Sequence, residues 1–305
     1  MLWHTSVLLL VILGIPGAAM PATMADPPGG DHHFKVRIGP RADRAGSYVV
    51  TSLTPPTERA VPAPADFDGD GQDDPAVYDV PAGNWYILHS SSGVLIQDKW
   101  GLGLSVPVPG DYDGDRRADL AVFEQPSAAW YVLGSKTGAI PMRVFGSSTS
   151  VPVPGDYDGD GKMDLAVFEP SNFVWRIKES ASGVQRELLW GWRDTIPVPG
   201  DYDGDGKTDL SVFHVKSGLW LQRLSTTKKL RLLQWGYQGV RPVPARYRGA
   251  TATDVAVFEP TSARWHVPGR STMTTQLGYP GVVPAPADYD GDGRADLAVY
   301  DPAKH

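Results

Sequence analysis

A nine-residue stretch that begins at Asp201 has the composition of a cation-binding loop. Its sequence, Asp-Tyr-Asp-Gly-Asp-Gly-Lys-Thr-Asp, places carboxylates at the first, third, fifth and ninth positions. Glycines at the fourth and sixth positions allow the positive φ angles that a tight turn requires. Calcium prefers such a set of hard oxygen ligands, because it binds six to eight oxygens at about 2.3–2.6 Å. The stretch therefore predicts a calcium-binding loop.

The same frame recurs along the chain. Further copies begin at Asp66, Asp111, Asp156 and Asp288, most of them 45 residues apart. A fixed period of this length is typical of a repeat protein, in which each unit buries its faces against its neighbours.

One copy of the frame, residues 246–254, is altered. Arg246 and Arg248 replace its first two aspartates. We expect a guanidinium paired with Asp254 to take the place of the ion in this copy. In the copy that begins at Asp111, Arg116 replaces a glycine, which costs about 1 kcal/mol if that position needs a positive φ.

Each repeat contains four short segments with the character of strands. In the third repeat they lie at residues 151–154, 165–168, 175–177 and 187–191, with the carboxylate loop after the first. Alternating prolines such as Pro197 and Pro199 suit an edge strand, because proline cannot donate a hydrogen bond. Four antiparallel strands per 45 residues predict an all-β fold, a β-propeller whose first strands line a central channel.

Tryptophans repeat in register with the loops. We interpret the series as core packing, the alternative being a ring of platforms on which sugars stack. The series consists of Trp85, Trp130, Trp175, Trp220 and Trp265.

The last repeat stops after two segments, and the N-terminal region contains two strand-like segments, 34–38 and 47–50. We therefore expect a six-bladed propeller closed by these N-terminal strands, which removes free sheet edges. The predicted organisation is a signal peptide at 1–25, a flexible leader at 26–33 and a propeller at 34–305, with the last blade completed by 34–54. The repeats start near residues 61, 106, 151, 196, 241 and 283.

Composition limits the classes of function. The chain has 305 residues, a formal net charge of −7 and no cysteine, so disulfides, zinc–thiolate sites and cysteine nucleophiles are excluded. Five calcium ions would reverse the sign of the net charge and leave it small, and a small net charge gives little support to nucleic-acid binding.

Residues 1–25 carry no Asp, Glu, Lys or Arg, and their apolar run is shorter than the roughly 20 residues of a bilayer span. They predict a secretory signal peptide and hence a secreted protein, the alternative being an uncleaved anchor. We expect a monomer.

The repeat, in the form V-P-G-D-Y-D-G-D-G-K-x-D-L-A-V-F, resembles the FG-GAP/VCBS repeat family, which includes the heads of integrin α-chains, secreted bacterial proteins and some fungal lectins. Familiar members often have seven blades, whereas six units can be counted here. The resemblance implies about five calcium ions, held by the aspartates at positions one, three, five and nine and by the carbonyl at position seven. These carbonyls belong to Gln72, Arg117, Lys162, Lys207 and Arg294. The implied metal ligands are Asp66, Asp68, Asp70, Asp74, Asp111, Asp113, Asp115, Asp119, Asp156, Asp158, Asp160, Asp164, Asp201, Asp203, Asp205, Asp209, Asp288, Asp290, Asp292 and Asp296.

The function predicted from these features is that of a secreted, calcium-stabilised binding module for glycans. Two alternatives are a protein-adhesion module of the integrin-head type and a polysaccharide-degrading enzyme. No catalytic residue is assigned, because the sequence contains no G-x-S-x-G, H-E-x-x-H or phosphate-binding loop. Acidic residues that end the second segments are interpreted as turn caps, the alternative being acceptors for sugar hydroxyls. They are Asp79, Glu124, Glu169, Glu259 and Asp301.

Overall fold

The computed structural model describes residues 33–37, 48–52, 59–249, 251–269 and 274–302. The predicted signal peptide (1–25) and all but the last residue of the predicted leader (26–33) lie outside these residues. The described part of the chain contains no helix with the length and apolar character that crossing a bilayer requires.

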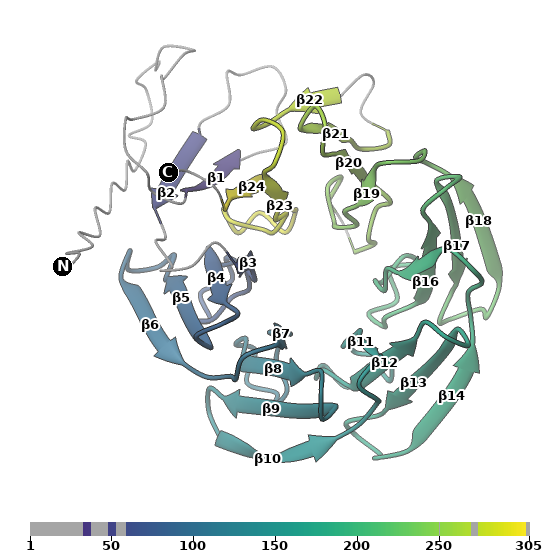
Figure 1. The fold of residues 1–305 in the computed structure, drawn as a ribbon, viewed down its shortest axis with the longest axis horizontal. Coiled ribbons are helices and arrows are strands. Elements are labelled where there is room, and N and C mark those ends of the chain that lie inside the picture. Colours follow the sequence, from purple (N-terminus) through teal and green to yellow (C-terminus); the bar gives the residue numbers. More distant parts are fainter. Residues whose placement is uncertain (1–32, 38–47, 53–58, 250, 270–273, 303–305) are drawn as a thin grey trace.

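The described residues form four-stranded antiparallel sheets arranged as blades around a centre (Figure 1). Five blades are built from consecutive strands. The first strand of each blade lies at the edge of its sheet, nearest the centre, as the prolines predict. These first strands are β3 (Ala60–Pro62), β7 (Ser105–Pro107), β11 (Val151–Pro152), β15 (Thr195–Pro197) and β19 (Arg241–Pro242).

The remaining strands follow in order toward the periphery of each blade. The second strands are β4 (Ala76–Asp79), β8 (Leu120–Glu124), β12 (Leu165–Glu169), β16 (Leu210–His214) and β20 (Val257–Glu259). The third strands are β5 (Asn84–Leu88), β9 (Ala129–Gly134), β13 (Val174–Lys178), β17 (Leu219–Arg223) and β21 (Arg264–His266). The outer strands are β6 (Leu95–Lys99), β10 (Gly138–Val144), β14 (Gln185–Leu189), β18 (Leu230–Gln234) and β22 (Thr274–Gln276). We number these blades 1 to 5 in chain order.

A further four-stranded sheet combines segments from both ends of the chain. It contains β1 (His33–Arg37), β2 (Tyr48–Ser52), β23 (Val283–Pro284) and β24 (Leu297–Asp301), in the order β2-β1-β24-β23. The central pairing is antiparallel and aligns Lys35 with Val299. The two N-terminal strands begin and end within two residues of the segments expected from the sequence. We call this unit the composite sheet.

The core lies between blades, where the second strands are covered on both faces. Ala166 and Val167 of β12 are fully buried, as the continuous apolar run predicts. Trp175 is also fully buried, packs against Phe168 with a ring separation of 5.5 Å, and donates its indole N–H to the carbonyl of Trp190 at 2.9 Å. All five tryptophans of the predicted series are at most 1% exposed. The core interpretation is confirmed, and stacking of sugars on these five rings is excluded.

Candidate metal sites between the first and second strands

The carboxylate loops connect the first and second strands of their sheets, and we number them by chain order. They are loop 1 (66–74), loop 2 (111–119), loop 3 (156–164), loop 4 (201–209), loop 5 (246–254) and loop 6 (288–296). Loop 3 shows the shared geometry. Asp156 accepts the N–H groups of Gly159 at 2.5 Å and Gly161 at 2.8 Å. Both glycines have the positive φ that the sequence predicts, 83° and 87°. The first aspartate therefore shapes the turn with both of its oxygens.

Arg116 of loop 2 occupies the position of the second glycine with a φ of 71°. Arg116 therefore carries the expected backbone strain, because a residue with a Cβ atom adopts the left-handed region only at a cost in conformational free energy.

The ninth aspartate anchors each loop to its own blade. In loop 3, Asp164 is fully buried and accepts the N–H of Tyr157 at 2.9 Å and that of Ser180 at 2.6 Å. Ser180 lies in the turn between the third and outer strands, so one carboxylate joins two turns of the blade. The same pair of contacts is made by Asp74, Asp119 and Asp209.

The sequence interpretation missed the serines of that turn. The Ser180 hydroxyl donates to Asp160, the fifth position of the loop, at 2.9 Å. Equivalent serines donate to the fifth aspartates of loops 1, 2 and 4. Their period of 45 residues is visible in the sequence, and it could have identified them as Ser90, Ser135, Ser180 and Ser225.

The loops bring carboxylate oxygens into compact groups. In each of five loops, three aspartates offer oxygens that all lie within 4.8 Å of one another. The groups are Asp66, Asp68 and Asp70; Asp111, Asp113 and Asp115; Asp156, Asp158 and Asp164; Asp201, Asp203 and Asp209; and Asp288, Asp290 and Asp296. The remaining implied ligands, outside these groups of three, are Asp74, Asp119, Asp160, Asp205 and Asp292.

Buried oxygens without a donor show that these groups fit a cation. Both carboxylate oxygens of Asp203 are buried and receive no hydrogen bond, and the same holds for one oxygen of Asp113. A buried carboxylate that lacks a partner is costly, and a metal ion is one of the few groups that compensate it. The oxygen-only donor set suits calcium rather than a soft metal.

The pKa values of two loop carboxylates shift in opposite directions. Burial raises the pKa of Asp209 to about 6 and outweighs the hydrogen bonds from Ser225 and Tyr202. At the third position of loop 2, burial also raises the pKa of Asp113, but the hydrogen bonds from Thr137 and Lys136 outweigh it and leave that pKa below its ordinary value. Burial raises the pKa of Asp119, the ninth residue of loop 2, so in that loop the third aspartate holds its charge more readily than the ninth.

Loop 5 has an ion pair in place of the carboxylate group, as expected. The Arg248 guanidinium donates Nε–H to Asp254 at 2.6 Å and makes a second contact with the same oxygen through a terminal nitrogen. The backbone N–H of Arg248 also donates to Asp254 at 3.0 Å. The ninth aspartate thus keeps its link to the loop backbone, and the paired charge comes from Arg248.

Neighbouring loops are joined by backbone hydrogen bonds. The N–H at position eight of one loop donates to the carbonyl at position one of the preceding loop, as in Thr208 to Asp156 at 2.6 Å. The position-eight N–H of each of the six loops makes this bond, including Asp73 to Asp288 at 2.6 Å, between blade 1 and the composite sheet. Position-seven side chains add a second link, since Lys207 donates to the carbonyl of Asp158 at 2.5 Å. Sequence spacing alone did not reveal these contacts between blades.

The acidic residues that end the second strands have mixed surroundings. Glu124 and Glu259 accept the hydroxyls of Ser127 and Ser262, three residues later, so these two cap turns as expected. Glu169 differs, because it accepts the hydroxyl of Ser150 at 2.6 Å from the connection that leads into its own blade.

Comparison with known proteins identifies the repeat. A family model described as FG-GAP-like repeat matches residues 111–167. No curated protein sequence matches the chain significantly.

Among solved structures, a lectin from Agrocybe aegerita described as recognising non-reducing terminal N-acetylglucosamine superimposes with a TM-score of 0.56 and 14% identity, over 88% of this chain and 84% of the lectin. A virginiamycin B lyase from Staphylococcus aureus, solved with quinupristin, superimposes with a TM-score of 0.55 and 12% identity, over 91% of this chain and 97% of the lyase. At these identities the likeness concerns the fold alone. The repeat match at residues 111–167 and the propeller arrangement of the blades together support an FG-GAP repeat β-propeller family for this chain.

Proposed function

We propose that this protein is a secreted, calcium-stabilised propeller that binds glycans. The calcium assignment is carried by the buried oxygens of Asp203, which have no donor and face a group of two further carboxylates. Each of loops 1 to 4 and loop 6 would hold one ion with its aspartates, giving about five ions. The position-seven carbonyls would complete the oxygen set. Bound calcium neutralises the carboxylates and holds each turn between the first and second strands.

We also propose that the composite sheet closes the propeller as a sixth blade. Two observations support closure: β1 pairs with β24, and Asp73 of blade 1 donates to Asp288 of the composite sheet. The side chain of Asp73 accepts the N–H of Asp288 in return, at 2.7 Å. This reciprocal pair gives the junction more hydrogen bonds than a backbone link alone.

A disulfide test of closure is straightforward, because the chain has no native cysteine. The variant Lys35→Cys with Val299→Cys places two thiols at paired positions of β1 and β24. Oxidation should cross-link it within the monomer, whereas Lys35→Cys with Leu297→Cys should not, because the diagonal separation of about 7–8 Å exceeds disulfide reach. Equal cross-linking of both pairs, or of neither, would argue against the closed ring.

The glycan assignment is supported by surfaces between the blades. Tyr237, 45% exposed, follows the outer strand of blade 4 and lies with its ring 6.2 Å from that of His266 in blade 5. Glu259, beside it, accepts the hydroxyl of Ser262, which is the chief cause of its lowered pKa. An exposed aromatic face beside a charged acceptor is suited to a sugar ring and its hydroxyls. The similarity of fold to the Agrocybe aegerita lectin favours the same class of ligand.

A glycan array in calcium buffer, repeated with chelator, tests the whole proposal. We expect saturable binding that weakens when calcium is removed. The variant Tyr237→Ala should weaken binding if this surface contributes, and Tyr131→Ala, on β9 of blade 2, is the control for loss of a tyrosine elsewhere. A blank array with retained calcium binding would refute glycan recognition and leave the metal assignment intact.

Export of the mature chain with residues 1–25 removed, checked by N-terminal sequencing of the secreted protein, tests the proposed signal peptide.

A further inference from the structure

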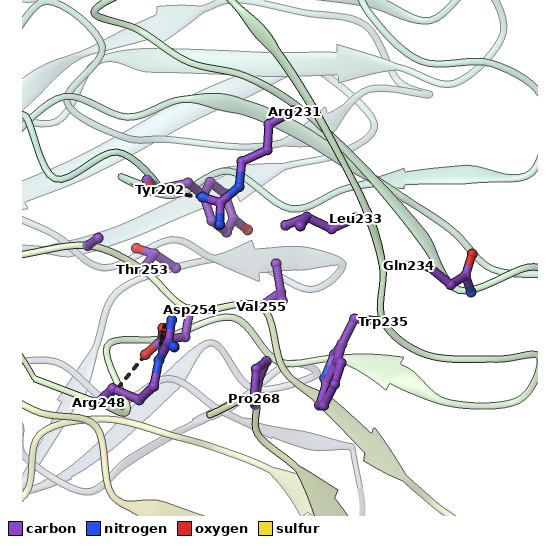
Figure 2. Close-up of a pocket in the computed structure, with 11 residues that line it drawn as sticks. Tyr202, Arg231, Leu233, Gln234, Trp235, Arg248, Thr253, Asp254, Val255 and Pro268 are labelled. Carbon is purple, nitrogen blue, oxygen red and sulfur yellow. Dashed lines mark hydrogen bonds and ion pairs between the residues drawn. The ribbon is translucent and has the colours of Figure 1, made fainter. Parts of the chain in front are cut away.

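A pocket between blades 4 and 5 is lined by residues that differ in charge from those at the equivalent positions one repeat earlier. It has a volume of about 360 Å³, within the usual range for small-ligand sites. Arg231 reaches toward it from β18, and Arg248 and Asp254 of loop 5 lie on the opposite side (Figure 2). We call it the arginine pocket; Trp235, Tyr202 and Pro268 complete its main walls.

Arg231 provides an uncompensated positive charge. Its guanidinium donates only a long hydrogen bond, 3.4 Å, to the carbonyl of Tyr202. Within the described residues, no ion pair of Arg231 with a carboxylate is found. Arg248 is already neutralised by Asp254. The side chains that line the pocket therefore carry one positive charge in excess.

The preceding repeat compensates the charge of the equivalent arginine with a glutamate. Arg186 occupies the equivalent position on β14 and pairs with Glu179 at 2.7 Å. Leu224 stands where the next repeat would have that glutamate, which leaves Arg231 without a partner. The facing loop changes in the same sense, because Arg248 replaces Asp203. Two substitutions in one interface thus convert an acidic surrounding into a basic one.

We propose that the arginine pocket binds an oxyanion, a carboxylate or sulfate ester, carried by a sugar residue. A guanidinium donates two parallel hydrogen bonds to a carboxylate or to two oxygens of a tetrahedral oxyanion such as a sulfate ester, and Arg231 keeps further N–H donors besides its long bond to Tyr202. The indole of Trp235, partly exposed on the wall, offers a face for the ring of the same sugar. This inference rests on the proposed glycan-binding function and specifies one ligand class for one site.

Calorimetric titration of the full mature chain in calcium buffer tests the assignment. The probes are D-glucuronate, glucose 6-sulfate and the neutral parent glucose. We expect one site for one or both anionic probes, and the stronger binder distinguishes a carboxylate from a sulfate ester. Glucose should bind at least about tenfold more weakly, because a hydrogen-bonded charge pair is lost.

Three variants distinguish binding in the arginine pocket from nonspecific attraction of an anion to positive charge. Arg231→Gln should weaken the anionic probe about ten- to a hundredfold. Arg186→Gln, the matched change in the preceding repeat, should leave binding unchanged. Leu224→Glu restores the glutamate of that repeat and should weaken binding while keeping Arg231 in place. Thermal unfolding of each variant checks that it is folded.

The outcomes distinguish this inference from the proposed function. Equal losses in Arg231→Gln and Arg186→Gln, or tight binding that Arg231→Gln does not affect, would overturn the arginine pocket. Failure of both anionic probes, with glycan-array binding of neutral sugars retained, would overturn the pocket and leave the glycan-binding function standing. Failure of the anionic probes together with a blank array would overturn both.

Discussion

Substitution of Gly155 by alanine tests whether the residue that precedes each loop sets the distance between neighbouring blades. A Cβ atom at Gly155 would lie 2.7 Å from Oγ1 and 2.9 Å from Cγ2 of Thr208, at position eight of the next loop. Thr208 cannot retreat freely, because its N–H donates to the carbonyl of Asp156 at 2.6 Å. Gly155 does not have a positive φ, so the penalty is steric rather than conformational. We expect Gly155→Ala to lower the free energy of unfolding by about 1–3 kcal/mol, the usual cost of overpacking.

An earlier repeat of the same protein has alanine at both of these positions and provides a natural comparison for this prediction. Two repeats earlier, the equivalent residues are Ala65 and Ala118, and the same backbone bond is kept, with Ala118 donating to Asp66 at 2.7 Å. Thr208→Ala should therefore rescue Gly155→Ala, with a coupling energy of about 1–2 kcal/mol. The rescued variant should match or exceed the native stability, since alanine reduces the entropy of the unfolded chain relative to glycine.

Urea unfolding followed by tryptophan fluorescence, at fixed calcium concentration, measures the four corners of the cycle. The m-value should stay constant across them, so that differences in midpoint report stability. An equal loss from Gly155→Ala in both backgrounds would show that the clash lies elsewhere. Unchanged stability of the single variant would refute the idea that this contact sets the spacing.

Three further predictions concern the loops. Asp203→Asn should reduce the number of calcium ions bound by one and lower the melting temperature in calcium buffer, as measured by calorimetry, whereas Asp254→Asn in loop 5 should leave the number of ions unchanged. The calcium affinity of loop 4 should be highest above about pH 7 and should fall as pH drops through the Asp209 pKa of about 6, because protons compete with calcium for a carboxyl whose pKa is raised. Calcium titrations at pH 5, 6 and 7 measure this fall. In the calcium-free protein, the contribution of Asp209 to stability has the opposite pH dependence. The pKa of this carboxyl in the folded protein exceeds the ordinary 3.8, so its contribution to the free energy of unfolding is present below pH 3.8 and is lost as pH rises through about 6. Arg116→Gly should raise the free energy of unfolding by about 0.5–1 kcal/mol by relieving the left-handed φ of 71°, and an unchanged urea midpoint would contradict that account.

The features that the sequence predicted are those fixed within one repeat. The spacing of Asp156, Gly159 and Gly161 follows from the chemistry of a tight oxygen-lined turn, so the loop geometry could be derived residue by residue. The alternating prolines and the period of the tryptophans likewise predicted an edge strand and a core position. The pairing of Arg248 with Asp254 was accessible because a lost cation site leaves one buried carboxylate to be neutralised.

The features that the sequence did not predict depend on how blades meet. Contact of Gly155 with Thr208 requires the rotation between consecutive blades, which no local pattern contains. Ser180 was overlooked for a different reason: serine is common in turns, and its role appears only when the turn is seen beside Asp160 and Asp164. The free charge of Arg231 depends on the absence of a glutamate seven residues earlier, which is informative only once Arg186 and Glu179 are known to pair.

Loop 5 keeps the hydrogen bond between neighbouring blades without its first two carboxylates. In the carboxylate loops, the carbonyl of the first residue accepts the neighbouring N–H at 2.6–2.7 Å. In loop 5 the first residue is Arg246, and its carbonyl still accepts the N–H of Ala295, at 3.0 Å. The link between blades therefore survives the loss of the first two carboxylates, provided that Arg248 neutralises Asp254. Loop 5 thus keeps a correctly shaped turn with balanced charge through the Arg248–Asp254 ion pair, and under the proposed calcium assignment a bound ion would balance the charge of the other loops.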